Sequence, residues 1–323
     1  MVSLIACEKA DMYTRHPKTN LDALWKILDE NYCFFEYKEV DWDEIYLKYE
    51  RLIKDDMSQY ELFYLLGDMI KELKDGHTSL YSFFDIARYR DWYEDYPPNF
   101  NAEVHNLYLG KNCLIAGGLK YCRMSNNQIG YIYYESFTSP VGEHNLDEVL
   151  IYFKDCKGLI IDVRENVGGS LTYSDRITSR FLEEKTLTGY IIHKTGKGHN
   201  DFSQPYPIEI TPSNHERWLR PVVVLTNRQT YSAANDFASN MKILPNVTLM
   251  GDQTGGGGGL PYNSELPNGW QVRFSASPIL NVDKEYTEHG VQPDIKVELK
   301  ESDIEKRKDT LIEEAILLLL SKS

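Results

Sequence analysis

Long apolar runs are absent from this sequence of 323 residues. A helix that crosses a bilayer needs about 20 consecutive apolar residues. The longest late run, Ala315 to Leu320, is short and has charged residues on both sides. We therefore expect no membrane-spanning segment in the folded body.

Positive charge is also scarce. The chain has 35 Lys and Arg residues against 49 Asp and Glu residues, which gives a net charge of -14 at pH 7. Such a charge repels phosphate backbones and anionic lipid head groups. The composition therefore argues against nucleic acid as a partner.

Cysteines are few, and none forms a CxxC pair. They are Cys7, Cys33, Cys113, Cys122 and Cys156. This spacing indicates neither a zinc knuckle nor a dense disulfide framework. Buried free thiols are the expected state, and a single bridge from Cys113 to Cys122 remains an open alternative.

Motifs for metals and nucleotides are missing as well. The sequence contains no H-E-x-x-H, no carboxylate cluster and no G-x-x-x-x-G-K-[ST] loop, which are patterns that hold zinc or phosphate groups. The glycine run 255–259 lacks a following lysine, and we interpret it as a flexible loop near a substrate cleft. We expect no metal and no cofactor.

The start of the chain carries an indication of location. Leu4 to Cys7 resembles a bacterial lipobox, and the polar stretch Glu8 to Asn20 is typical of a tether. This predicts a periplasmic or cell-envelope protein attached to a membrane through a lipidated Cys7. Only six residues precede Cys7, too few for a complete signal peptide, so either the start of the chain has been trimmed or the match is accidental.

What the sequence does contain is ample apolar material, with 42% hydrophobic and 12% aromatic residues, enough for an ordered core. Three helices are predicted before residue 80. The first begins after Asn20 as its N-cap, and the third ends near Gly76, where glycine permits a left-handed residue. The second and third helices begin with capping boxes, at Asp41 with Glu44 and at Ser58 with Glu61.

Residues beyond 126 alternate between strand and helix patterns. The apolar strands 159–163 and 222–226 are typical of a sheet buried on both faces, so we expect an α/β body with active residues at the strand ends. The predicted division is a tether (1–20), a helical unit (21–80), a connecting region (81–125) and an α/β core (126–323). The connecting region is expected to hold irregular strands.

Three segments at strand ends are candidates for the active site. Residues 162–170 leave a strand through Gly168 and Gly169 and enter a helix, so free N–H groups there can face an anion; a tight turn that needs glycine for sterics is the alternative. Ser232 opens a helix, either as its N-cap or as a nucleophile at a strained turn. Glu288 precedes a Gly-Val-Gln-Pro-Asp segment that alone would be a surface loop.

Five blocks of the sequence carry the further argument: Leu73–Leu80, Ile161–Gly169, Leu225–Ala234, Gly251–Gly256 and Gly290–Asp294. Taken together, they resemble the S41 peptidase family. This family contains the C-terminal processing peptidases, the tricorn protease core and the interphotoreceptor retinoid-binding protein repeats. The resemblance implies a crotonase-like α/β fold, with its elements wrapped into a spiral.

The family divides by its catalytic base. The tail-specific branch uses a lysine in a T-x-G-K-G loop, but residues 254–259 of this chain contain none. The tricorn-like branch uses a histidine, a serine and a late glutamate, and these roles fall on His77, Ser232 and Glu288. The resemblance therefore implies a serine peptidase acting on peptide or protein substrates.

The chemistry of these residues fits the implied roles. An imidazole can take the serine proton and return it to the leaving amine, and Glu288 would orient it. Tricorn-like enzymes have a serine before the histidine; here Gly76 stands there, so a relay through Thr78 or Ser79 stays open. His289 is a weaker candidate for the base.

The oxyanion would be met by N–H groups at the same turn. The expected donors are the N–H of Gly168 or Gly169 and that of Ala233. Residues 81–126 leave too little room for a full PDZ domain, so recognition of a substrate carboxylate by strand addition is not expected. Two alternatives remain. One is a non-catalytic binding protein on this fold, with a vestigial triad, that holds an apolar or peptide ligand. The other is hydratase-like acyl-CoA chemistry, for which the chain lacks the paired glutamates near the glycine turn.

Overall fold

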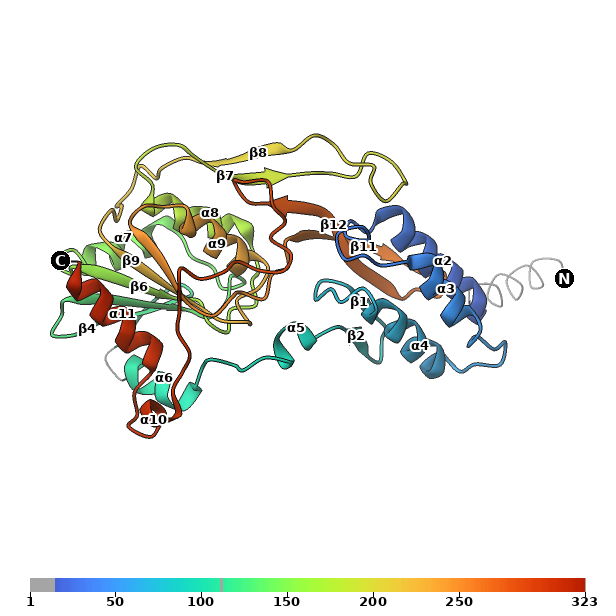
Figure 1. The fold of residues 1–323 in the computed structure, drawn as a ribbon, viewed down its shortest axis with the longest axis horizontal. Helices are drawn as coiled ribbons and strands as arrows, with labels where there is room; N and C mark the ends of the chain where they lie inside the picture. Colours follow the sequence, from blue (N-terminus) through green and yellow to red (C-terminus); the bar gives the residue numbers. More distant parts are fainter. Residues whose placement is uncertain (1–14, 111–112, 323) are drawn as a thin grey trace. The chain divides into compact units, whose positions relative to one another are not determined.

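The computed structural model describes residues 15–110 and 113–322. Cys7 and most of the predicted tether lie outside them. The chain forms two compact units, which do not coincide with the predicted boundaries at 80 and 125. We call them the helix–sheet unit (15–92, 191–206 and 259–279) and the main-sheet unit (93–190, 207–258 and 280–322, where described) (Figure 1).

The helix–sheet unit begins with three helices, as predicted. These are α2 (Pro17–Asn31), α3 (Trp42–Glu50) and α4 (Gln59–Lys71). Asp41 caps α3 by accepting from the Glu44 N–H, and Ser58 with Glu61 forms a full capping box at α4. The capping residues in the sequence were therefore sufficient to predict where α3 and α4 begin.

Two details of these helices differ from the prediction. α2 starts three residues before Asn20, because Pro17 occupies the first turn, where its fixed φ favours a helix start. Asn20 is buried inside the helix, and its Oδ1 accepts from the Asn268 N–H. After α4 the left-handed residue is Lys74, with φ 46°, and not Gly76.

This unit also contains an antiparallel sheet in the order β2-β1-β12-β11. Its strands are β1 (Ser79–Tyr81), β2 (Ile86–Arg88), β11 (Gly259–Glu265) and β12 (Gln271–Leu280). α4 packs on β1 and β2, and Phe63 meets Trp270 edge-on at 5.3 Å between ring centroids. Segments far apart in the sequence thus share one core.

The main-sheet unit is built on seven strands in the order β13-β10-β9-β6-β5-β4-β3. The neighbours from β13 to β5 are parallel, and β4 and β3 continue the sheet antiparallel. The strands are β3 (Leu114–Ala116), β4 (Leu119–Met124), β5 (Ile129–Tyr134), β6 (Gly158–Asp162), β9 (Val222–Thr226), β10 (Val247–Gly251) and β13 (Ile295–Lys296).

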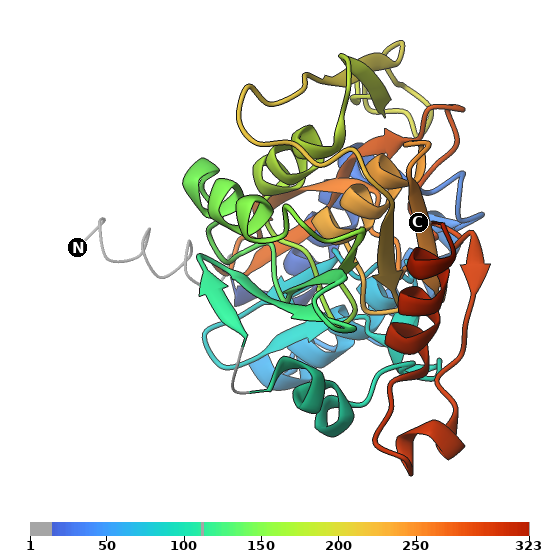
Figure 2. The ribbon, with the colours of Figure 1, turned by 90° about the vertical axis from the view of Figure 1, so that its left-hand side faces the viewer.

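Both faces of this sheet are covered, which confirms the predicted α/β body. Ile161 and Val224 belong to one apolar cluster with Phe237 of α9, and Ile160 and Val223 belong to another with the C-terminal helix. That helix, α11 (Thr310–Ser321), is red in Figure 2 and packs on β6, β9 and β10. The helices of the first face are α7 (Glu143–Tyr152), α8 (Leu171–Thr178), a 3-10 turn (Ser179–Phe181) and α9 (Ala233–Lys242).

The region predicted to be an irregular connection is more ordered than expected. It contains α6 (Ala102–Leu109) and the hairpin of β3 and β4, which joins the main sheet through β5. The hairpin pairs with a strand nearby in sequence, but its strands are short and lack a clear alternation of apolar and polar residues. The remaining elements are α5 (Asp91–Glu94), β7 (Thr186–Ile191), β8 (Tyr206–Ile210) and α10 (Glu301–Ile304).

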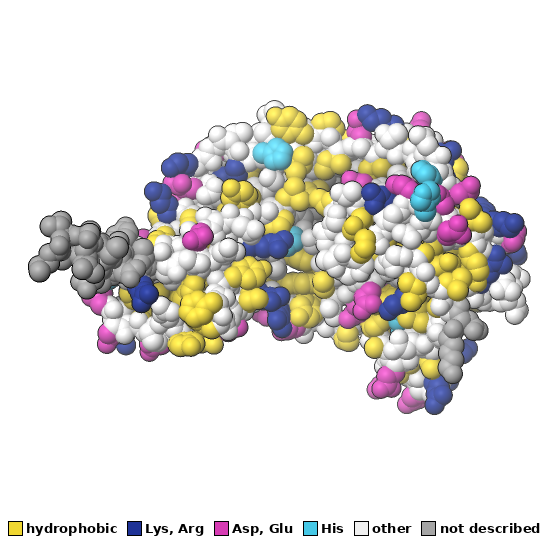
Figure 3. All heavy atoms as spheres, turned by 180° about the vertical axis from the view of Figure 1, so that it is seen from behind, with side chains coloured by type: hydrophobic (Ala, Val, Ile, Leu, Met, Phe, Trp, Pro, Cys, Tyr) yellow, Lys and Arg dark blue, Asp and Glu magenta, His cyan; other side chains and the backbone are white. Residues whose placement is uncertain are grey.

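Basic and acidic side chains are intermingled on the face drawn in Figure 3. Within residues 15–110 and 113–322, no helix combines the length and the apolar character that crossing a bilayer would take.

Candidate active site

Ser232 lies at the start of α9 in a strained backbone conformation. Its φ is 56° and its ψ is -121°, a region that costs a residue other than glycine about 1–3 kcal/mol. Its side chain makes no capping bond to α9, so the N-cap interpretation fails. A strained serine between a strand and a helix is the geometry of a nucleophile elbow.

Neighbouring segments hold this turn from both sides. The Ser232 N–H donates to the Gly256 carbonyl at 2.8 Å, and the Tyr231 N–H donates to the Asn166 carbonyl at 3.0 Å. The Ser232 carbonyl in turn accepts from the Asp236 N–H, one helical turn along α9. These bonds offset the cost of the unusual φ.

The double-glycine turn after β6 lies against Ser232. Gly168 has φ 94°, and a Cβ there would lie 2.8 Å from the Ser232 Cβ and 2.6 Å from the Tyr231 carbonyl oxygen. Gly169 has φ 145°, and its Cβ would lie 2.3 Å from the Phe137 carbonyl carbon. Both positions therefore require glycine, for backbone conformation and for space.

The backbone N–H groups at this turn differ in whether they have a hydrogen-bond acceptor. The Gly168 N–H donates to Asn166 Oδ1 at 2.9 Å. The N–H groups of Gly169 and Ala233 have no acceptor among the described residues. Asn166, which sequence reasoning missed, also donates to the Tyr134 carbonyl, so one buried amide fixes the turn. Its place inside the block from Ile161 to Gly169 was the available signal.

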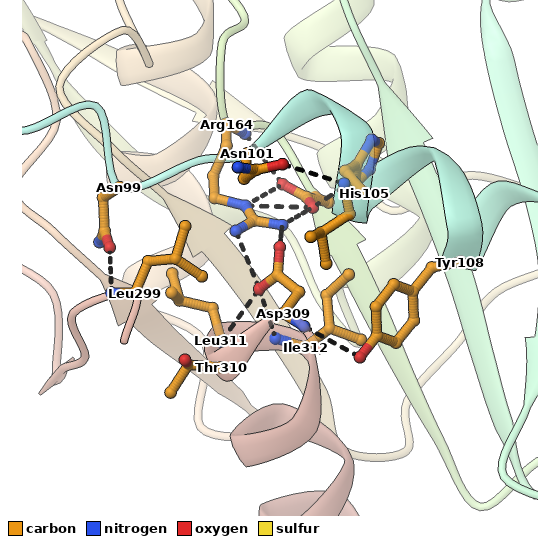
Figure 4. Close-up of polar contacts among 12 residues, drawn as sticks. Asn99, Asn101, His105, Tyr108, Arg164, Leu299, Asp309, Thr310, Leu311 and Ile312 are labelled. Carbon is orange, nitrogen blue, oxygen red and sulfur yellow. Dashed lines mark hydrogen bonds and ion pairs between the residues drawn. The ribbon is translucent and has the colours of Figure 1, made fainter. Parts of the chain in front are cut away.

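A buried charge cluster anchors the same strand end, as Figure 4 shows. Arg164 has no exposed surface, and its Nη2 lies 2.7 Å from Asp162 Oδ2 and 3.0 Å from Asp309 Oδ2. Burial opposes ionisation of Asp162, but the Arg164 guanidinium holds the pKa of this carboxyl below its ordinary value. The cluster therefore remains charged.

Asp309 connects this cluster to the C-terminal helix. Its Oδ1 accepts from the N–H groups of Leu311 and Ile312 and so caps α11. The same carboxylate binds Arg164, two residues before Asn166. The start of α11 and the glycine turn are therefore tied to one guanidinium (Figure 4).

The Gly-rich loop, residues 254–259, contacts both Ser232 and the segment around Glu288. The Gly257 N–H donates to the Glu288 carbonyl at 3.1 Å, and a Cβ on Gly256 would lie 1.8 Å from that carbonyl oxygen. The interpretation of this loop as flexible is wrong, because its backbone is hydrogen-bonded and its glycines permit close packing. Glu288 is buried, and so is most of the neighbouring loop.

Asn235 of α9 is hydrogen-bonded to both of these segments. Its Oδ1 accepts from Thr254 Oγ1 at 2.6 Å, and its Nδ2 donates to the Thr287 carbonyl at 3.2 Å. Ser232 and Glu288 thus belong to one unit and are linked through a shared loop. Asn235 was a further residue that sequence reasoning missed.

His77 belongs to the helix–sheet unit, in the turn before β1. It is 8% exposed, and burial, aided by the charges of Arg273 and Lys38, lowers its pKa to about 4. The imidazole is therefore neutral at pH 7, the state in which it accepts a proton. Its backbone N–H donates to Asp75 Oδ1 at 2.8 Å, and the buried Asp75 carboxylate was also missed.

The two predicted relay residues follow His77 directly. Thr78 is 1% exposed and Ser79, in β1, is 5% exposed. The Thr78 hydroxyl is buried without a hydrogen-bond partner among the described residues. Both side chains lie next to the imidazole in sequence, and their part in a relay stays a prediction.

Comparison with known proteins gives the family. The model of peptidase family S41 matches residues 128–297, and that of the tricorn protease C1 domain matches residues 13–71. The chain belongs to peptidase family S41. This confirms the resemblance inferred from the five sequence blocks.

Relatives of known structure share its fold. A crystal structure from Parabacteroides merdae, described as a candidate peptidase, is 60% identical with a TM-score of 0.92, over 95% of this chain and 98% of that one. Mature CPAF is 14% identical with a TM-score of 0.70, over 94% of this chain and 96% of that one; at that identity the likeness shows the fold alone. The crotonase-like fold class implied for this S41 chain is confirmed.

Among curated proteins, the carboxy-terminal processing protease CtpA of Bacillus subtilis is 29% identical over 182 residues. That match covers 55% of this chain and 37% of CtpA. A carboxyl-terminal-processing protease of Synechocystis is 28% identical over 147 residues, covering 44% of this chain and 31% of that protein. The chain therefore spans about a third of the length of these relatives.

Proposed function

We propose that this S41 protein is a serine peptidase that hydrolyses peptide bonds through an acyl-enzyme on Ser232. The observation that carries the proposal is the backbone of Ser232, held at φ 56° without a capping role. A strained conformation of this kind persists only where the surroundings enforce it, which is typical of active sites. Membership of a peptidase family supports the same activity.

In the proposed reaction, Ser232 Oγ attacks the carbonyl carbon of the scissile bond. His77 takes the serine proton and then gives it to the leaving amine. A water molecule, activated by the same imidazole, hydrolyses the acyl-enzyme and restores Ser232. The pKa of His77, lowered to about 4 mainly by burial, keeps the base unprotonated at neutral pH.

The oxyanion of the tetrahedral intermediate is assigned to the N–H groups of Gly169 and Ala233. Both lack an acceptor among the described residues, whereas the Gly168 N–H is engaged by Asn166. Loss of one such donor typically costs about 3 kcal/mol of barrier. Gly168 would then serve mainly to let its strand end approach Ser232.

Glu288 is assigned the role of stabilising the imidazolium that forms on His77, directly or through the Thr78 or Ser79 hydroxyl. Its burial in the segment fastened by Asn235 supports a fixed carboxylate. Asp75 supplies a second negative charge near the imidazole. The proposed substrates are peptides or proteins, and a cell-envelope location with lipidation of Cys7 remains part of the proposal.

The test is active-site labelling with a fluorophosphonate, followed by tryptic mapping. Cleavage after Arg228 and Lys242 places Ser232 in the peptide 229–242, and we expect the label there on Ser232. Ser239→Ala is the matched control, because Ser239 lies in the same peptide on the buried face of α9. The control should label fully and Ser232→Ala not at all.

A protein that stays unlabelled while a reference serine hydrolase reacts would contradict the proposal. It would favour the alternative of a binding protein on the same fold. Label on Ser239 in place of Ser232 would reject the assignment of the nucleophile.

A further inference from the structure

The hairpin at the edge of the main sheet brings two cysteines into register. β3 pairs antiparallel with β4, and Leu114 lies opposite Tyr121. One step further from the turn, the same register places Cys113 opposite Cys122. The sequence analysis left a bridge between these two cysteines open, because their spacing does not show where the hairpin turns.

The turn type decides what kind of pair this is. Gly117 and Gly118 connect the strands, and only Gly117 has a positive φ, 59°, as in a two-residue type II′ turn. The Ala116–Leu119 pair beside such a turn is hydrogen-bonded, and the pairs then alternate. Cys113 and Cys122 therefore form a non-hydrogen-bonded pair, whose Cα atoms lie about 4.5 Å apart, within the range of disulfides.

The side chains agree with this placement. Burial raises the pKa of both thiols, and each thiol lies close enough to affect the pKa of the other. Cys122 is buried, and its Sγ lies 3.8 Å from the Tyr108 carbonyl oxygen of α6. Cys113 is more exposed, and both thiols are reduced in this structure.

We propose that Cys113 and Cys122 are a redox modification site that closes to a cross-strand disulfide on reaction with a disulfide oxidant. The Cys113 thiolate attacks one sulfur of the oxidant, forms a mixed disulfide and releases one thiol. The Cys122 thiolate then attacks Cys113 Sγ and releases the second thiol. Two protein thiols are oxidised, one oxidant disulfide is reduced to two thiols, and the two thiol protons pass to the thiols released.

The disulfide would cross-link β3, the edge strand of the main sheet, to β4. β3 has no strand on its outer side in the described chain, and its Ile115 is 72% exposed. Such an edge frays and recruits other strands unless it is restrained. The hairpin turn also contacts the following segment, because the Gly118 N–H donates to the Pro140 carbonyl at 2.9 Å. A closed bridge would fix β3 against β4 and raise thermal stability.

The test treats the folded, full-length protein with oxidised glutathione at pH 8, blocks remaining thiols with an alkylating reagent and maps tryptic peptides. Cleavage after Lys111, Lys120 and Arg123 separates the two cysteines into peptides 112–120 and 121–123. We expect these two peptides joined by one disulfide, with Cys33 and Cys156 alkylated only after unfolding. Oxidation should raise the unfolding temperature and go faster at higher pH.

Two variants sharpen the result. Cys156→Ser should keep the linked peptides, because Cys156 is buried and its thiol donates to the Asn127 carbonyl, away from the hairpin. Cys122→Ser should stop at a glutathione adduct on Cys113 and show no rise in unfolding temperature. Alkylation of both Cys113 and Cys122 after prolonged oxidation, or a bridge from either one to another cysteine, would overturn the proposal.

Discussion

Ser232 and His77 are prepared for their proposed roles in different ways. The surroundings of Ser232 act on its backbone, through a positive φ held by the hydrogen bond to Gly256 and by the segments fastened to Asn235. The surroundings of His77 act on its charge, because burial lowers its pKa. The comparison teaches that the proposed nucleophile depends on the conformation of the main chain, whereas the proposed base depends on the electrostatic effect of burial.

The largest effect on activity is expected from a substitution that adds a side-chain carbon next to Ser232. Gly168→Ala would place a Cβ 2.8 Å from the Ser232 Cβ, so one of the two turns must shift. Because such a shift would misplace Ser232 relative to the substrate, we expect peptidase activity, measured as kcat/KM, to fall by about 10²-fold. Gly269→Ala is the matched control, because Gly269 also has a positive φ, 86°, but nothing lies within 4 Å of the added Cβ.

The control variant should lose some stability from backbone strain and retain its activity. Equal losses of kcat/KM in the two variants would show that strain, and not the approach of Gly168 to Ser232, decides activity. That result would contradict the statement that the main-chain conformation around Ser232 prepares it for its proposed role.

A smaller effect on activity, but a clear one on stability, is expected at the charge cluster. Asp309→Asn keeps the shape of the helix cap and removes one of the two carboxylates that face Arg164. Breaking a buried ion pair costs about 3 kcal/mol, which denaturant unfolding will measure. Glu209→Gln, which breaks the exposed pair with Lys185, should change the free energy of unfolding by less than about 1 kcal/mol.

If the two variants lose stability equally, Arg164 does not anchor the strand end in the way described. If Asp309→Asn unfolds at lower denaturant and also loses activity several-fold, the cluster positions the glycine turn as well as the helix. Tyrosine and tryptophan fluorescence of the folded variants will separate a local change from a general one.

The sequence predicted the parts of the fold that depend on neighbours in the chain. The caps at Asp41 and Ser58 and the buried strand at 222–226 are local patterns, and the structure confirms them. Asn20 failed as a cap because Pro17 begins the helix earlier. The sheet of the helix–sheet unit was not predicted, because β1 pairs with β12, and such long-range pairing leaves no local signal.

The candidate site was predicted in part for the same reason. The family blocks gave Ser232, His77 and Glu288 as candidates, and their catalytic roles stay predictions. The local sequence left Ser232 as either a side-chain cap or a nucleophile, and the missing cap bond removes the first of these alternatives. The amide of Asn166 and the carboxylate of Asp75 were missed, because their importance lies in hydrogen bonds to turns that only the folded chain displays.

The pKa of His77 also predicts an acid limit to stability. Its folded value, about 4, lies below its ordinary value of about 6.5, so unfolding takes up a proton at intermediate pH. The stability due to the neutral, buried imidazole is complete above pH 6.5 and is lost as the pH falls toward 4. Any kinetic measurement at low pH therefore needs circular dichroism to confirm that the protein is folded.

The most direct test of the account is the pH dependence of fluorophosphonate labelling of Ser232. If the buried His77 is the base, the labelling rate should stay constant from pH 8 down to pH 6 and fall only at lower pH, with a midpoint near 4. His77→Ala should label at least about 10²-fold more slowly, whereas His193→Ala, at an exposed position, should label like the unchanged protein. A midpoint near 6.5, or undiminished labelling of His77→Ala, would contradict the account.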